Sequence, residues 1–152
     1  MSCIGADSKA NLVIANSIAE MEKVVDFVER FGAAHTIPRA ITNALNLCLD
    51  ELLNNTISYG YEDQEPHSIA IQLSLANGVL VAEIQDDATP FDPRKVVFAA
   101  PNEPLRSRRI GGLGLHFVKT LVDELGYMRV GRQNVGRVTK RLSQEQAMEI
   151  AE

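Results

Sequence analysis

The sequence contains 152 residues, a length that fits one domain with a single hydrophobic core. Apolar residues make up 45% and charged residues 23% of the chain, as in ordinary soluble globular proteins, and the net charge of −5 argues against a main task of binding nucleic acid. No apolar run reaches the length of a membrane span, the N-terminus lacks a leader pattern, and there are only two cysteines, so we expect a cytoplasmic protein.

The first part of the chain predicts a strand followed by a covering helix. Leu12–Ala15 is a short apolar run of the kind found in strands. Ser17 and Glu20 then form a capping-box pattern, and the apolar residues that follow recur at helical spacing until Gly32, a plausible helix end. This helix has one apolar stripe, so we expect it to cover a sheet.

The stretch from Pro38 to about Ser58 predicts a second, longer amphipathic helix. Glu51 and Asn55 are four residues apart and therefore share one face of this helix, with Asn54 beside them. Adjacent asparagines within a helix are locally unfavourable, because their amides compete for backbone hydrogen bonds. A carboxylate beside two amides suits the binding of a ligand, and the alternative is an ordinary solvated helix face.

The clearest local pattern is a β-hairpin centred on Asn77-Gly78, the preferred pair for a two-residue turn. Pairing across this turn sets Leu75 opposite Leu80, and each further pair follows at intervals of two residues until Ile69 faces Asp86. Asp86 is thereby placed on the apolar face of the sheet, where an unpaired carboxylate is costly and needs a partner or a ligand. The alternative is that Asp86 lies beyond the strand end, in solvent.

A basic, irregular segment follows from Arg94 to Arg109, broken by two prolines. Its length and charge predict a functional segment, and a solvated loop is the alternative. It leads into Gly111–His116 and then an apolar helix that we expect to end at Gly126. Glycines at a helix N-terminus let backbone N–H groups approach an anion such as a phosphate, although this turn matches neither the P-loop nor the dinucleotide fingerprint.

The end of the chain predicts two closing strands and a short helix. The strands are Tyr127–Val130 and Val135–Leu142, joined by a turn around residues 131–134. Ser143 with Gln146 forms another capping-box pattern, which predicts a C-terminal helix.

Three separated segments together predict a nucleotide site. The helix face offers an amide oxygen for a hydrated metal, the strand end offers a carboxylate for a base edge, and the glycine turn offers N–H donors for phosphates. Magnesium keeps few protein ligands and completes its shell with phosphate oxygens and water, so one asparagine suffices.

The order E-x-x-x-N, D-x-x-x-P-F-D-P and G-G-L-G-L-H-F-V resembles the ATP-binding fold shared by gyrase, heat-shock chaperones, histidine kinases and mismatch-repair ATPases. Within that superfamily the chain is most similar to the small anti-sigma-factor serine/threonine kinases of bacteria, from about Leu12 to Leu142. The resemblance implies a single-domain α+β two-layer sandwich, with helices on one face of a mixed, mostly antiparallel sheet. ATP would lie between the layers beneath a lid at about residues 92–111.

The resemblance also implies roles for individual residues. Asn55 would be the Mg2+ ligand, Glu51 the general base that activates a protein hydroxyl or a water, and Asp86 the acceptor of the adenine amino group. The phosphates would be bound by the glycine turn, with Arg109 assisting; the turn comprises Gly111, Gly112, Leu113, Gly114 and Leu115.

Two further positions follow from the same resemblance. Thr139 falls where the family often places a hydroxyl near adenine. Ala88 stands where the family commonly has glycine, two residues after the aspartate; alanine does not easily adopt a positive φ, which predicts a slightly altered adenine pocket.

Three interpretations remain open at this point, and the third of them is a structural domain that binds no nucleotide. The first is a serine/threonine protein kinase that phosphorylates a small anti-sigma-factor antagonist, also binds a sigma factor or another target, and forms a homodimer as the family commonly does. The second is a non-catalytic regulatory module that binds nucleotide and a protein partner. The cofactors of the kinase would be ATP and Mg2+.

Overall fold

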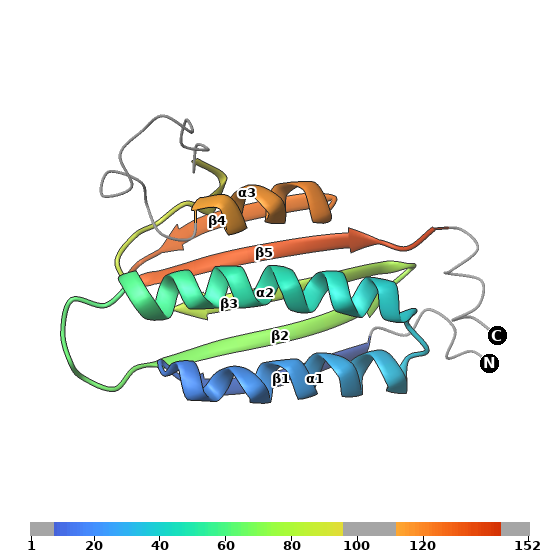
Figure 1. Cartoon of the computed structure of the whole chain (residues 1–152), viewed down its shortest axis with the longest axis horizontal. Coiled ribbons are helices and arrows are strands. Elements are labelled where there is room, and N and C mark those ends of the chain that lie inside the picture. Colours follow the sequence, from blue (N-terminus) through green and yellow to red (C-terminus); the bar gives the residue numbers. More distant parts are fainter. Residues whose placement is uncertain (1–7, 96–111, 144–152) are drawn as a thin grey trace.

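The computed structural model describes residues 8–95 and 112–143, which form a sheet covered on one face by helices (Figure 1). The strands are β1 (Ser8–Ala15), β2 (Ser68–Ala76), β3 (Val79–Asp86), β4 (Glu124–Val130) and β5 (Gln133–Arg141). Their spatial order is β1-β2-β3-β5-β4, and every pairing is antiparallel. The predicted two-layer fold is confirmed, with an antiparallel sheet in place of a mixed one.

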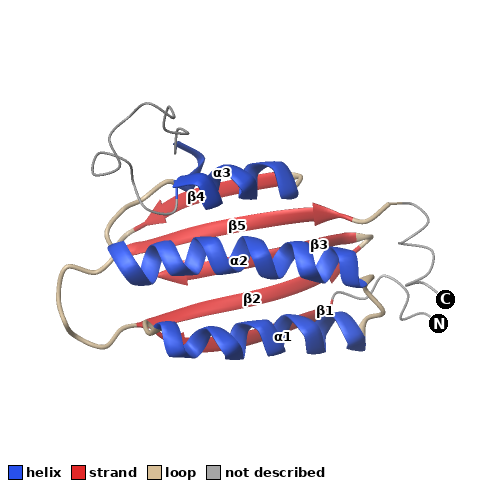
Figure 2. Ribbon diagram, in the orientation of Figure 1, coloured by secondary structure: helices blue, strands red, loops and turns tan. Residues whose placement is uncertain are grey.

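In the part of the chain that the structure describes, α-helices form the second layer (Figure 2). They are α1 (Met21–Ala34), α2 (Arg39–Tyr59) and α3 (Gly112–Leu121), with short 3-10 turns η1 (Ile18–Glu20) and η2 (Pro93–Lys95). The core lies between the layers, where Leu49 and Leu53 of α2 and Leu73 of β2 are fully buried. No helix in the described ranges is both long and apolar enough to cross a membrane.

The β2–β3 hairpin has the register that the sequence predicts. Asn77 and Gly78 both have positive φ, at 52° and 74°, as a type I′ turn requires. Leu75 pairs with Leu80, and the ladder continues to Ala70 opposite Gln85. The alternation therefore carries Asp86 to the helix-covered face, where it is 5% exposed.

Two helix ends differ from the prediction. Gly32 does not end α1, which continues to Ala34; a Cβ on Gly32 would lie 2.5 Å from Thr42 Cγ2, so this glycine lets α2 approach closely. Helix α3 ends at Leu121, and Leu125 and Gly126 belong to strand β4. The predicted C-terminal helix, after Ser143, and residues 96–111 of the lid predicted at about 92–111 lie outside the described residues.

Candidate functional site

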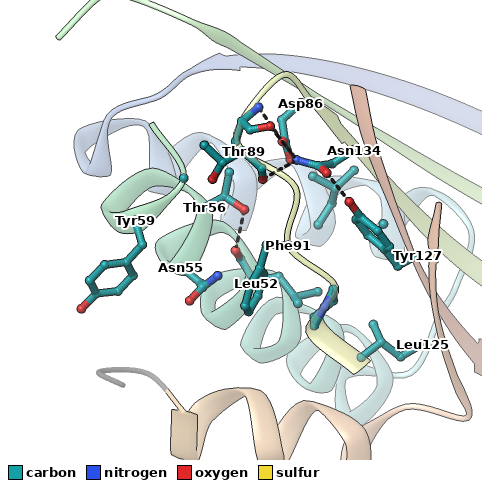
Figure 3. Close-up of a pocket in the computed structure, with 15 residues that line it drawn as sticks. Leu52, Asn55, Thr56, Tyr59, Asp86, Thr89, Phe91, Leu125, Tyr127 and Asn134 are labelled. Atoms are coloured by element: carbon teal, nitrogen blue, oxygen red, sulfur yellow. Dashed lines mark hydrogen bonds between the residues drawn. The ribbon is translucent and has the colours of Figure 1, made fainter. Parts of the chain in front are cut away.

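A cavity opens between the C-terminal half of α2, the end of β3 and the β4–β5 hairpin (Figure 3). It encloses about 600 Å³, including space open to solvent. Apolar side chains form most of its walls, and a few polar groups point into it. The lining residues are Leu52, Asn55, Thr56, Tyr59, Gly60, Ile84, Asp86, Ala88, Thr89, Phe91, Pro93, Leu125, Tyr127, Asn134 and Gly136.

Asp86 and Asn55 line this same cavity, although they come from different elements. Asp86 reaches it because the period-two alternation of β3 turns its side chain toward the helices. Asn55 reaches it from the buried, mostly apolar face of α2 and is 7% exposed. The helix face and the strand end are therefore brought together, as the sequence predicts.

The two oxygens of the Asp86 carboxyl group have different surroundings. Oδ1 accepts hydrogen bonds from the backbone N–H of Ala88, at 3.0 Å, and from Nδ2 of Asn134, at 2.9 Å. Oδ2 has no hydrogen-bond donor among the described residues. Burial raises the pKa of this carboxyl group, and the hydrogen bond from Asn134 opposes that rise. The free oxygen makes Asp86 an acceptor for a donor on a ligand.

Asn55 carries the second unused acceptor. Its Oδ1 is buried and has no hydrogen-bond partner in the described part of the chain. An orphaned buried carbonyl is costly, and it is the kind of oxygen that Mg2+ or a ligand donor satisfies. The donor chemistry at Asn55 therefore fits a magnesium ion that takes its other ligands from phosphate and water.

Glu51 lies one helical turn before Asn55 but is not among the residues that line the cavity. Its side chain is partly exposed, and burial, with a smaller contribution from the charge of Asp50, raises its pKa. The role of Glu51 as a general base stays a prediction.

Ala88 fits its position without a strained backbone. The described non-glycine residues with positive φ are Thr36 and Asn77, so the backbone at Ala88 does not require glycine. The space for its methyl group is provided by Gly60 at the end of α2, where a Cβ would lie 2.8 Å from Cβ of Ala88. The Thr89 N–H also donates to the Gly60 carbonyl, at 2.8 Å, so the helix end and the loop after β3 are joined at this point.

Two of the remaining predicted site residues, Thr139 and Leu115, do not line the cavity. Thr139 pairs with Val81 and lies beside Glu124 and Arg137 on the sheet face away from the core. Leu115 is buried in the hydrophobic core. The backbone of Gly112, Leu113 and Gly114 forms the first turn of α3, and Arg109 and Gly111 lie outside the described residues.

Sequence reasoning missed Asn134, the residue of β5 that contacts Asp86. The predicted strand began at Val135, which left Asn134 in the turn, whereas the strand begins at Gln133 and pairs Asn134 with Asp86. Counting back in steps of two from buried Val138 would have placed Asn134 on the inner face. Tyr127, whose hydroxyl donates to Asn134 Oδ1, was predicted only as a strand residue.

A second polar cluster lies next to the end of β3, around His67 at the end of the α2–β2 loop. His67 contacts Asp63 through Nε2, at 2.8 Å, and Asp87 through Nδ1, at 3.1 Å, while its ring stacks on Tyr61. The hydrogen bond to Asp63, followed by that to Asp87, raises the pKa of His67. This cluster holds the α2–β2 loop against the residue that follows Asp86.

A protein-family model and several named kinases match this chain in sequence. The model of the family described as "Histidine kinase-like ATPase domain" matches residues 14–140. Serine/threonine-protein kinase BtrW of Bordetella bronchiseptica is 28% identical over 85 residues, which are 56% of this chain and 60% of that protein. Serine-protein kinase RsbW of Listeria innocua is 26% identical over 85 residues, 53% of this chain and 54% of that protein. The match thus spans little more than half the length of these relatives.

Two solved structures share the fold. The crystal structure of the RsbU and RsbW domains of a Mycobacterium tuberculosis protein superposes with a TM-score of 0.63 at 16% identity, covering 89% of this chain and 32% of that one. The histidine kinase domain of a blue-light activated kinase from Erythrobacter litoralis gives 0.51 at 21% identity, covering 88% and 64%.

Proposed function

This chain belongs to the histidine kinase-like ATPase domain family, and from that membership we propose that it is an ATP-dependent serine/threonine protein kinase. Its protein substrate would be a small anti-sigma-factor antagonist, and it would also bind a sigma factor and form a homodimer. The observation that carries the proposal is one cavity with two acceptors that receive no donor from the described residues, Oδ2 of Asp86 and Oδ1 of Asn55.

The cavity suits the adenine end of ATP. Leu52, Ile84 and Phe91 are among the apolar residues that line it, and they would cover the faces of the base. Asp86 Oδ2 would accept a hydrogen bond from the adenine amino group, which supplies the donor that this buried carboxylate lacks. The base would therefore be recognised by one polar contact within an apolar slot.

The phosphate end would lie toward Asn55. Asn55 would hold a magnesium ion, which neutralises charge on the phosphates when bound. Glu51, one turn away, would accept the proton of the attacking serine or threonine hydroxyl. The raised pKa of Glu51 moves it toward the range in which a carboxylate is a better proton acceptor.

The test of the kinase proposal is the Glu51→Gln variant, incubated with labelled ATP, magnesium and candidate antagonist proteins. Glutamine keeps the shape but cannot take a proton, so we expect loss of phosphate transfer, by about a hundredfold to ten-thousandfold, with ADP binding retained. Glu29→Gln, on the exposed face of α1, is the matched control and should transfer phosphate like the parent. Undiminished transfer by Glu51→Gln would contradict the proposed role of Glu51.

One observation favours a second candidate, a regulatory module that binds nucleotide and a partner without transferring phosphate. Glu51 stands outside the lining of the cavity, whereas the proposed base-recognition and metal-binding groups stand inside it. A pull-down of partners with and without magnesium-ATP, followed by phosphosite mapping, separates the two candidates. Nucleotide-dependent capture without any phosphoprotein would favour the module.

A further inference from the structure

Asn134 is the centre of the hydrogen-bond network on the Asp86 side of the cavity (Figure 3). Its Nδ2 group donates to Asp86 Oδ1 at 2.9 Å, and to the carbonyls of Ala88 and Thr89 at 3.1 Å each. Its Oδ1 accepts from the Tyr127 hydroxyl and from Nη1 of Arg129, the latter at 3.0 Å. Asn134 is 7% exposed, so these bonds replace water almost completely.

The orientation of this amide is fixed by its neighbours. Arg129 has only donors, so the atom of Asn134 that faces its guanidinium must be the oxygen. The NH2 group must then face Asp86, where it donates to Oδ1. Arg129 Nη1 is itself held by the Ala88 carbonyl, at 2.9 Å. The amide therefore cannot turn over without leaving two donors facing each other.

This arrangement leaves only one oxygen of the Asp86 carboxylate without a donor from the described residues. Oδ1 of Asp86 already accepts two bonds, and the nearby carbonyls of Ala88 and Thr89 each accept from Asn134. Oδ2 of Asp86 is the oxygen of this group that receives no donor from the described residues. A carboxylate with both oxygens free can bind two parallel N–H donors, and one with a single free oxygen cannot.

We propose that Asn134 determines the base specificity of the nucleotide site, by occupying one oxygen of Asp86 so that only a base with one donor at that edge is bound well. Adenine presents one amino group beside a ring acceptor, whereas guanine presents N1–H and an amino group side by side. Guanine would therefore bury one N–H group without an acceptor. The free-energy penalty of that unpaired donor exceeds the net contribution of an ordinary hydrogen bond. This inference rests on the proposed nucleotide site and adds a residue that selects adenine over guanine.

The experiment measures dissociation constants of magnesium-ADP and magnesium-GDP by calorimetry for the full chain and for Asn134→Ala. In the variant, exchangeable water replaces the fixed amide, and guanine can displace water from Oδ1. We expect the preference for ADP over GDP to fall at least about tenfold, or about 1.4 kcal/mol. Asn11→Ala is the matched control, because Asn11 lies on exposed β1 and contacts Gln72; its preference should equal that of the parent.

A second variant covers the case in which Asn134→Ala does not unfold cooperatively. Tyr127→Phe removes one of the two donors that hold the amide oxygen and keeps the ring, so the ADP preference should fall in the same direction, by about twofold to threefold. An unchanged preference in a folded Asn134→Ala protein, or in Tyr127→Phe where Asn134→Ala fails, overturns the inference while the proposed function stands. A parent protein that binds neither nucleotide overturns both, and one that binds ADP and GDP equally overturns the inference alone.

Discussion

Replacing Asp86 with asparagine tests two effects of its carboxylate separately: the free-energy cost of burying the charge in the fold, and the contribution of the carboxylate to nucleotide binding. Asparagine has the same shape, and its carbonyl oxygen can keep the bonds from Ala88 N–H and Asn134 Nδ2. What changes is the charge, which burial disfavours, and the outward-facing atom, which becomes an NH2 donor. The variant should therefore fold at least as stably as the parent and bind nucleotide poorly.

The pH dependence of stability has a definite sign. Burial raises the folded-state pKa of Asp86 above its ordinary value of 3.8, so the carboxyl group stabilises the fold most when it is protonated, below that value. This contribution is lost as pH rises through the folded-state pKa. The stability advantage of Asp86→Asn should consequently appear as pH is raised from about 4 to 7 and should vanish below the ordinary pKa.

The expected loss of affinity follows from one hydrogen bond. A bond to a charged acceptor contributes about 1.5–3 kcal/mol, which corresponds to about 10-fold to 150-fold weaker binding of magnesium-ADP. Urea unfolding across the pH series gives the free energy of unfolding, and calorimetry gives the affinity. The reasoning would be refuted by a variant that is less stable than the parent at neutral pH, or that binds ADP equally well.

Three further changes test neighbouring contacts. Asn55→Ala should abolish the effect of magnesium on ADP affinity, measured with and without EDTA. It should not destabilise the free protein by removing a hydrogen bond to Oδ1, because that oxygen has no partner among the described residues. Gly60→Ala should lower the free energy of unfolding by about 1–3 kcal/mol in urea, since its Cβ would lie 2.5 Å from the Thr56 carbonyl oxygen and 2.8 Å from Cβ of Ala88. Adding Ala88→Gly should recover only the part of that loss that comes from the contact with Ala88. In the parent, protonated His67 should stabilise the fold fully below its ordinary pKa of 6.5, and this stabilisation should disappear as pH rises through the raised folded-state pKa. His67→Gln should lack this pH-dependent stabilisation, which the free energy of unfolding measured across that pH range would show. Equal pH profiles for the two proteins would contradict the role of the aspartate contacts of His67.

The parts of the fold that could be predicted from sequence are those with a strict period. The hairpin turn at Asn77-Gly78 fixes the register by backbone geometry alone, and the alternation of β3 then places Asp86 on the inner face. The apolar period of α2 likewise predicts its bounds to within about one residue and places Asn55 above the strand end. The regular period of each element predicts which face each residue occupies, and the family resemblance is what implied that the two faces meet at one site.

Glycine misled the prediction of two helix ends. Gly32 was expected to end α1, and Gly126 to end α3, because glycine is common after the last helical turn. Gly32 instead lies inside α1 against Thr42, and Gly126 lies in β4 opposite Arg137. The apolar run through Leu121 and Leu125 has no feature that marks where helix gives way to strand, so its division depends on tertiary contacts.

The cavity itself was the least predictable part, because its shape depends on pairs of residues far apart in sequence. Glycine at position 60 and alanine at position 88 are each unremarkable alone, yet the missing side chain of the first makes room for the methyl group of the second. The amide of Asn134 is likewise uninformative until the β3–β5 register sets it opposite Asp86. A change at either member of such a pair alters the site through its partner, so the two should be substituted together when their roles are tested.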